Sequence, residues 1–201
     1  MFSPASASRS PRFSPRTDAV PMVVNRVITI DEFERTALEG RWELIDGEPV
    51  EMTPSADESS SIGATILGLL WSPVRPRGLG RLYSSDGGFV LFPDRPTVRV
   101  PDAAFVRAER APQGKARKSF PRLAPDLVVE VLSPSDRASD VVAKLGMYQE
   151  AGVPLIWLGD PEKTTVTVIA GTSTTVLQSS DILDGGDVLP GFTVPVAEIF
   201  A

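Results

Sequence analysis

Apolar positions recur three and four residues apart in two segments of the chain, which predicts two amphipathic helices. These segments cover residues 57–71 and 139–151. A shorter helix is predicted over residues 31–38, because Thr29 and Glu32 stand three positions apart, as in a helix-capping box.

The segments between the helices are alternating or continuously apolar over short stretches, which predicts β-strands. Asp46-Gly47 separates the first two of them and predicts a hairpin turn. Residues 126–132 begin with Asp126 and continue as an apolar run with one acid, Glu130, inside it, which is typical of a central strand buried on both faces. Strands are predicted over residues 41–45, 49–52, 81–84, 89–92, 98–106, 126–132, 155–159, 164–170 and 174–177, and a short helix or strand over 196–200. This order favours an α/β (α+β) fold with one mixed sheet and an N-terminal β-hairpin.

The composition fits a single folded domain preceded by an extension. The chain has 201 residues, of which 42% are hydrophobic and 23% charged, as in a soluble globular protein. Residues 1–21 are dominated by Ser, Pro and Arg without periodicity, which predicts a disordered extension before a domain over residues 22–201. No apolar run approaches the ~20 residues of a membrane span, so we expect a cytoplasmic protein without a membrane segment.

The sequence contains neither cysteine nor histidine, and this limits its chemistry. Disulfides, zinc sites built on thiolate or imidazole, cysteine nucleophiles and the Ser-His-Asp triad are excluded. A hydrolase of this composition has to use carboxylates, lysine, hydroxyls and hard metal ions. The formal net charge of −6 excludes an overall basic surface for nucleic acid, but it is compatible with a local basic patch.

Two acids in otherwise apolar strands are candidates for a site. Glu130 lies inside the apolar run, where an unpartnered carboxylate is costly to bury, and Asp102 follows Pro101 at the start of another apolar strand. If the two strands are neighbours, the carboxylates can hold Mg²⁺ or Mn²⁺, which activates water without an imidazole. The alternatives are a buried structural ion pair for Glu130 and a strand-edge turn residue for Asp102.

Two further charged residues have a functional and a structural interpretation. Lys144 lies on the helix after Glu130 and can reach the metal site, or it can form a surface ion pair with Asp140 four residues earlier. Glu43 lies in the first hairpin strand and can supply a third carboxylate to the site, or it can face solvent.

A basic segment over residues 107–122 directly follows the strand that begins near Asp102. Such a segment in an acidic protein is a candidate for contact with the phosphate backbone of DNA, and the alternative is a solvated flexible loop. The expected contacts are Arg110, Lys115, Arg117 and Lys118.

A series of short motifs occurs in a fixed order over residues 25–200. They are Trp42-Glu43-Leu44-Ile45-Asp46-Gly47-Glu48, Met52-Thr53-Pro54, Pro101-Asp102-Ala103-Ala104-Phe105-Val106, residues 125–135, Lys144 followed by Ala151-Gly152-Val153, and Trp157 with Asp160-Pro161. In this order the motifs resemble the Uma-two family of restriction-endonuclease-like proteins. The resemblance implies the PD-(D/E)xK nuclease fold, in which helices flank a central mixed sheet that carries a divalent-metal site.

The resemblance also implies a role for individual residues. Asp102 is the acid of the Pro-Asp motif, Glu130 is the second acid, and the implied metal ligands are Asp102, Glu130 and Val131 for Mg²⁺ or Mn²⁺. Leu132 stands where the motif has its lysine, and Lys144 is the implied replacement. Glu43 matches a recurrent acid of the opening motif and is implied as a further member of the catalytic site.

The chain departs from the family at Ser59-Ser60-Ser61, where relatives often carry a histidine. Three functions are therefore considered: a metal-dependent DNA endonuclease, a catalytically inactive nuclease-fold module for binding or scaffolding, and a carboxylate-pair hydrolase that acts on another substrate. Because the net charge is negative, DNA binding would need a homodimer or a small concentrated basic surface.

Overall fold

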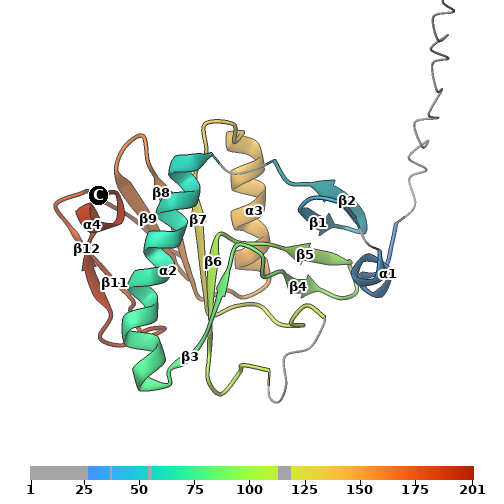
Figure 1. Cartoon of the computed structure of the whole chain (residues 1–201), viewed down its shortest axis with the longest axis horizontal. Helices are drawn as coiled ribbons and strands as arrows, with labels where there is room; N and C mark the ends of the chain where they lie inside the picture. The colour runs from blue at the N-terminus through green and yellow to red at the C-terminus, as the bar shows by residue number, and fades with distance from the viewer. Residues whose placement is uncertain (1–26, 37, 54–55, 113–118) are drawn as a thin grey trace, which may run out of the picture.

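The protein is described by a computed structural model, which covers residues 27–36, 38–53, 56–112 and 119–201. The predicted disordered extension, residues 1–21, lies outside this range. The N-terminal hairpin and the C-terminal elements lie at opposite ends of the molecule, with the central sheet and two long helices between them (Figure 1). The described strands form three sheets of six, four and two strands, so the prediction of one sheet is wrong.

The six-stranded sheet has the order β10-β9-β8-β7-β6-β3 and is the mixed central sheet that was predicted. Its parallel pair is β7 and β8, which α3 connects, and the other neighbouring strands are antiparallel. The elements are β3 (Gly80–Ser84), β6 (Ala103–Arg107), β7 (Leu127–Val131), α3 (Ala138–Glu150), β8 (Leu155–Asp160), β9 (Thr165–Ala170) and β10 (Ser173–Leu177). Strand β7 has neighbours on both sides, as its apolar run predicted.

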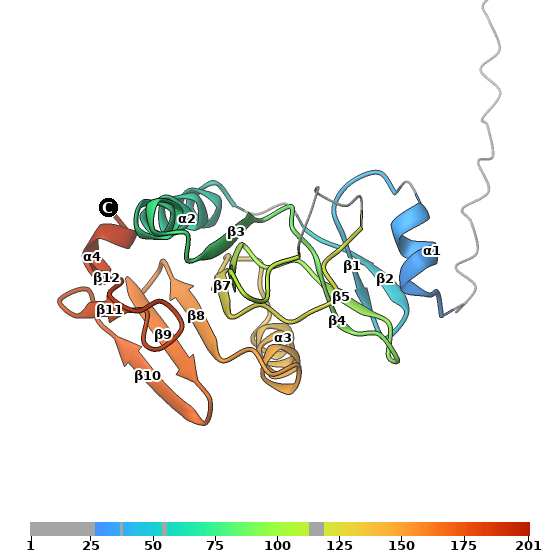
Figure 2. The same cartoon turned by 90° about the horizontal axis from the view of Figure 1, so that it is seen from below.

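Two helices cover opposite faces of the central sheet, as Figure 2 shows for α2 (Asp57–Arg77) and α3. Alternation along β7 explains which side chains meet each helix. Leu127 and Val129 belong to the hydrophobic cluster under α2, whereas Val128 packs with Tyr148 of α3 in the other cluster. The same alternation places Glu130 on the α3 face of the sheet.

The four-stranded sheet is built around the predicted hairpin and has the order β2-β1-β5-β4. Its strands are β1 (Trp42–Ile45), β2 (Glu48–Glu51), β4 (Phe89–Phe92) and β5 (Thr97–Arg99), and α1 (Ile30–Arg35) packs beside it. Asp46 and Gly47 have φ angles of 51° and 80°, the left-handed conformation that a tight hairpin turn requires. The capping box of Thr29 and Glu32 is present, with reciprocal hydrogen bonds between their side chains and backbone N–H groups.

The predicted strand over residues 98–106 is divided into β5 and β6, which belong to different sheets. Pro101 has no N–H to donate to a sheet, and the N–H of Val100 donates to a carboxylate oxygen of Glu43 at 2.8 Å instead of to a neighbouring strand. The chain therefore leaves one sheet and enters the other at residues 100–102. Asp102 consequently lies at the junction of the two sheets.

The C-terminal region closes the α2 side of the core. The short strands β11 (Ile182–Asp184) and β12 (Thr193–Pro195) were not predicted, and α4 (Val196–Ile199) takes the helical form of the two options considered for this segment. Helix α2 continues beyond its predicted end, residue 71, to Arg77, because Val74 in this last part is also buried in the core. Gly78 follows in the left-handed conformation and ends the helix. None of the helices in the described part of the chain has both the length and the hydropathy needed to cross a bilayer.

Candidate active site at the junction of the two sheets

A cavity of about 540 Å³ lies where the hairpin, the start of β6, the end of β7 and helix α3 meet. Every residue expected at the catalytic site contributes to its wall. They are Glu43, Asp102, Glu130, Val131 and Lys144. The structure therefore brings together residues that are up to about a hundred positions apart in the chain.

Glu130 is held by two side chains of α3. Its Oε2 accepts a hydrogen bond from Lys144 Nζ at 2.9 Å, and its Oε1 accepts one from Tyr148 Oη at 2.7 Å. Burial raises the pKa of Glu130 to about 7, and the nearby Asp102 adds to this rise while Lys144 and Tyr148 oppose it. Glu130 is thus a buried carboxyl group that titrates near neutral pH.

Lys144 projects inward from α3 and lies among acidic groups. Its Nζ is 2.9 Å from Glu130 Oε2 and 3.6 Å from Glu43 Oε1, and its side chain is 19% exposed. Burial lowers the pKa of Lys144, but the carboxylates of Glu130, Glu43 and Asp102 outweigh burial and leave the pKa raised, so the group is an ammonium. The surface ion pair with Asp140 is therefore wrong. Leu132 lines the same cavity, so Lys144 and the position of the motif lysine contribute to one cavity wall.

Asp102 faces the cavity from the passage between the sheets. Its Oδ2 accepts a hydrogen bond from the N–H of Val131 at 2.8 Å, which ties the start of β6 to the end of β7. Among the described residues none donates a hydrogen bond to its other oxygen, Oδ1, so this oxygen is available to a ligand. Burial raises the pKa of Asp102, and Lys144 and Arg41 act in the opposite direction.

The two acids lie at the same end of a strand pair. The antiparallel pairing of β6 and β7 ends at Ala103 and Val129, and Asp102 and Glu130 adjoin this last pair. Both acids line the same cavity, and the negative charge of Asp102 raises the pKa of Glu130. The expectation that the two strands are neighbours is confirmed.

Glu43 is buried at the edge of the same cavity rather than exposed, so the solvent-facing alternative is wrong. Its Oε2 accepts a hydrogen bond from Arg99 Nη1 at 2.6 Å, and its Oε1 accepts one from the N–H of Val100 at 2.8 Å. Arg99, Lys144 and these hydrogen bonds outweigh burial and lower the pKa of Glu43. Glu43 is therefore an ionised group that links β1, β5 and α3 around the cavity.

The donor atoms fit a hard cation only in part. Carboxylate oxygens are the ligands that Mg²⁺ prefers, and this ion commonly takes one or two carboxylates together with water and phosphate oxygens. Asp102 offers one oxygen without a hydrogen-bond partner among the described residues, whereas both oxygens of Glu130 accept hydrogen bonds from Lys144 and Tyr148. Across residues 27–201, apart from the gaps given above, no three acidic side chains are grouped so that they could hold a metal. Glu43 does not complete such a group because Arg99 and Val100 occupy its oxygens.

Sequence reasoning missed three residues of this region. Tyr148 lies four positions after Lys144 and so shares its face of α3, a spacing that could have indicated its contact with Glu130. Arg99 lies in an apolar segment, and its partner Glu43 is far away in sequence, so no local pattern reveals the pair. Arg41 lies near Asp102 and acts on its pKa, but it precedes the hairpin without any distinguishing motif.

The basic segment lies at the other end of β6. The 5-residue strand separates Arg107 from Asp102 by roughly 17 Å at ~3.4 Å per residue. Arg110 donates to Asp126 Oδ1 at 2.7 Å and to the carbonyl of Ala124 at 3.0 Å. The other expected contacts with DNA, Lys115, Arg117 and Lys118, lie outside the described residues. The nucleic-acid role of these four residues stays a prediction.

Comparisons with known proteins identify relatives of the chain. A family model described as "Uma2: Putative restriction endonuclease" matches residues 30–197. Among solved structures, a "putative nuclease belonging to DUF820" from Anabaena variabilis superposes with a TM-score of 0.76 at 23% sequence identity, covering 86% of this chain and 97% of that chain. At this identity the structural likeness shows a shared fold. No curated protein matches the chain.

Proposed function

The chain belongs to the Uma2 family, whose description is "Putative restriction endonuclease", and we propose that it is a Mg²⁺- or Mn²⁺-dependent endonuclease that hydrolyses DNA phosphodiester bonds. The observation that carries the proposal is the meeting of two carboxylates, Asp102 and Glu130, and the Lys144 ammonium on one cavity wall. Without histidine or cysteine, this trio is a chemically competent set for phosphodiester hydrolysis.

Each member of the trio has a distinct role in this proposal. Asp102 and Glu130, with the backbone of Val131, would hold the divalent cation. The chemistry that such a cation supplies is a lower pKa for the attacking water and polarisation of a phosphoryl oxygen. Lys144 orients the water and offsets the negative charge that develops on the phosphate. The water oxygen bonds to phosphorus as the bond to the leaving oxygen breaks, so no covalent enzyme intermediate forms.

Glu43 and Tyr148 act as positioning residues in this scheme. Glu43 of the four-stranded sheet holds Lys144 in the middle of α3, and Tyr148 fixes one oxygen of Glu130. Side chains that orient ligands in this way tune a metal site without touching the reacting atoms.

DNA is proposed as the substrate, and its backbone would be bound without sequence reading. The residues proposed to contact it are Arg110, Lys115, Arg117 and Lys118. The net charge of −6 weakens unaided binding, and a homodimer would present two such basic segments.

A catalytically inactive binding module is the second candidate. Both oxygens of Glu130 already accept hydrogen bonds, and no third acid joins the pair in the described part of the chain. In such a module Lys144 would serve as a permanent counter-ion that replaces the metal.

Nicking of supercoiled plasmid separates the two candidates. The wild-type protein is incubated with Mg²⁺, Mn²⁺ or EDTA beside the Asp102→Asn variant. If the protein is an endonuclease, the wild type should nick the plasmid with Mg²⁺ or Mn²⁺ and should not nick it in EDTA. The Asp102→Asn variant should not nick it under any of these conditions. Equal behaviour of wild type and variant with both metals would contradict the proposed activity and favour the inactive module.

A further inference from the structure

A second cavity of about 420 Å³ adjoins the candidate active site. The two cavities share Glu51, Met52, Ser59 and Asp102 in their walls, so two acids, Glu51 and Asp102, stand at the boundary between them. Lys144 lines the first cavity and Arg41 lines the second. Two cationic side chains therefore flank Asp102, one in each cavity.

Arg41 has hydrogen-bonding capacity that the fold does not use. One of its terminal nitrogens, Nη2, donates to the carbonyl of Ser85, which holds the guanidinium beside the loop after β3. Its Nε is buried and has no hydrogen-bond partner among the described residues. Because Nε is closed off from solvent, the nitrogen available to a ligand is Nη1, which is not among the buried atoms and has no hydrogen-bond partner among the described residues.

The other polar groups around the second cavity suit a phosphodiester. Ser60 and Ser84 are exposed and Ser85 is half-buried, so their hydroxyls can donate to an oxygen acceptor in the cavity. Phosphate contacts in nucleic-acid complexes come mostly from arginine, lysine and hydroxyl groups of this kind. Glu51 also lines the cavity, but it is exposed to water, which screens its charge.

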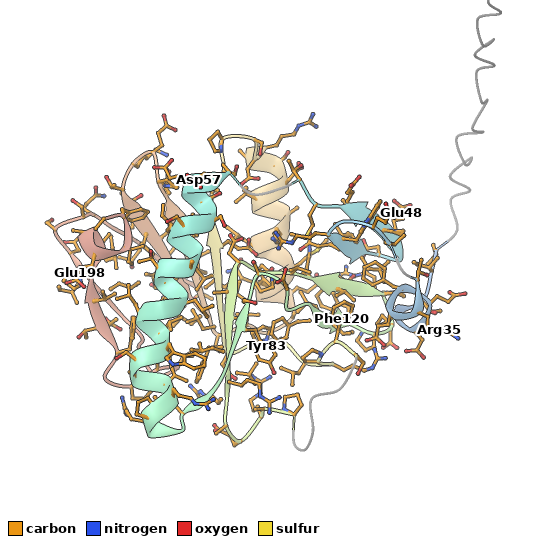
Figure 3. The ribbon with its side chains drawn as sticks, viewed as in Figure 1. Arg35, Glu48, Asp57, Tyr83, Phe120 and Glu198 are labelled. Carbon is orange, nitrogen blue, oxygen red and sulfur yellow. The ribbon has the colours of Figure 1, made fainter. Side chains whose placement is uncertain are left out.

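The first turns of α2 pass beside Asp102. A Cβ built on Gly63 would be 3.6 Å from the Cβ of Asp102, an ordinary van der Waals contact, so this part of the helix forms the wall of the second cavity next to the acid. In Figure 3, the labelled Asp57 marks the N-terminal end of α2, on the side of the molecule toward the hairpin that carries Glu48. The two cavities thus meet between the hairpin, which contributes Glu51, and the first turn of α2, which contributes Ser59.

We infer that Arg41, with the serine hydroxyls around it, binds a backbone phosphate of the nucleic acid next to the one that is cleaved. The inference rests on the proposed endonuclease function and adds the subsite that positions its substrate. The polynucleotide backbone passes from the Lys144 side of Asp102 to the Arg41 side. Recognition is through charge and hydrogen bonds to phosphate oxygens, so it is independent of base sequence.

Salt-dependent DNA binding tests the subsite without requiring catalysis. A fluorescein-labelled DNA duplex is titrated with the full chain in EDTA at several salt concentrations, and the slope of log affinity against log salt is measured. One lost phosphate contact lowers this slope by about 0.9. Arg41→Gln should therefore reduce the slope by about 1 and weaken binding several-fold on all sequences.

A matched control removes the same charge elsewhere. Arg75 is exposed near the C-terminal end of α2 and lies over the ring of Trp71, so Arg75→Gln should leave the slope unchanged. Arg41→Lys keeps the charge and should restore most of the slope even if the contact with Ser85 is lost. Thermal unfolding of each variant shows whether it is folded.

The outcomes separate the subsite from the endonuclease. An unchanged slope in Arg41→Gln, or an equal loss in Arg75→Gln, overturns the subsite even if the wild type cleaves DNA. Binding with the predicted slopes but no cleavage supports the subsite and overturns the endonuclease. Absence of DNA binding by the wild type overturns both.

Discussion

The two ends of β7 each carry a buried carboxylate, and the surroundings of the two groups differ. Asp126, just before the strand, is 3% exposed, and its oxygens accept hydrogen bonds from Arg110 and from the N–H of Arg107. Glu130, near the other end, faces a cavity and shares it with a second acid, Asp102. A buried acid in an apolar strand therefore indicates a site only when an open cavity and another acid accompany it.

The contrast lies in how the charges are balanced. Arg107 and Arg110 neutralise Asp126 from one side and hold the start of the basic segment against the sheet. At the other end, Arg99 pairs with Glu43 and Lys144 with Glu130, so both of these acids have a cationic partner. Asp102 has no ion-pair partner within the described residues, and in the proposed function the divalent cation would supply its countercharge.

The largest expected effect is a difference in DNA-cleavage rate between variants of Glu130 and variants of Asp126, the acids at the two ends of β7. If the wild type cleaves DNA, Glu130→Gln and Asp102→Asn should each lower the rate by at least about 100-fold, because each removes a charge at the reacting centre. Asp126→Asn should keep the rate within about threefold when assayed well below its melting temperature. Plasmid-nicking rates with Mg²⁺ measure all three, and equal losses in all three would remove the distinction.

The position of the ammonium gives the next effect. Lys144→Ala should lower cleavage by roughly 100-fold, because the charge on the phosphate is no longer offset. Leu132 lines the same cavity, so adding Leu132→Lys to this variant should restore at least about tenfold of the rate. If the double variant cleaves no faster than Lys144→Ala, an ammonium at this location is not what cleavage requires. The matched control for side-chain size adds Leu132→Met to Lys144→Ala.

The raised pKa of Glu130 predicts a pH dependence of stability without metal. Its pKa moves from 4.5 in the unfolded chain to about 7 in the fold, so the folded protein binds the proton more tightly between these values. The free energy of unfolding should therefore fall as pH rises from 5 to 7 and level off above, with a loss of up to about 3 kcal/mol.

Urea unfolding in EDTA at pH 5, 6, 7 and 8 checks this dependence. Glu130→Gln cannot titrate and should remove the fall that wild type shows. A wild-type profile that rises over this range, or one that the variant shares, would show that the carboxyl group is already ionised at low pH.

The smallest expected effect is on the free energy of unfolding and concerns Asp126, at the end of β7 away from the candidate active site. Asp126→Asn removes the charge that Arg110 binds and should reduce the free energy of unfolding by about 2 kcal/mol, as for the loss of a hydrogen bond to a charged group. Urea denaturation at pH 7 measures the change. A neutral result would mean that the partly exposed Arg110 contributes little to the fold.

Much of the fold follows from local patterns in the sequence. Asp46-Gly47 predicted the hairpin, the apolar run around Glu130 predicted a central strand, and Thr29 with Glu32 predicted the first helix start. These features depend on residues close together in the chain, where turn geometry and burial leave a direct pattern.

The division into two sheets could not be predicted in this way. Residues 98–106 are almost all apolar because both β5 and β6 are buried, although in different sheets, and only Pro101 indicates a break. The hydrogen bond from Val100 to Glu43 depends on a residue far away in sequence. Short strands such as β11, with one buried residue, carry too little pattern to be recognised.

The site was predictable in its acids and less so in its other members. Asp102 and Glu130 stand out because charged residues in apolar strands are rare. Glu43 lies in a short hairpin strand, where an acid does not differ from its surroundings as clearly. Its burial depends on Arg99, which contacts it only in the folded protein. Asp126 was not singled out because it begins its strand, where an acid is ordinary.

Binding of Mn²⁺ measured by isothermal titration calorimetry tests the central claim most directly, because it asks whether Asp102 and Glu130 share one ion. We predict a single site per chain in the wild type, lost in both Asp102→Asn and Glu130→Gln and retained in Asp126→Asn. Failure of the wild type to bind, or undiminished binding by either of the first two variants, would contradict the claim.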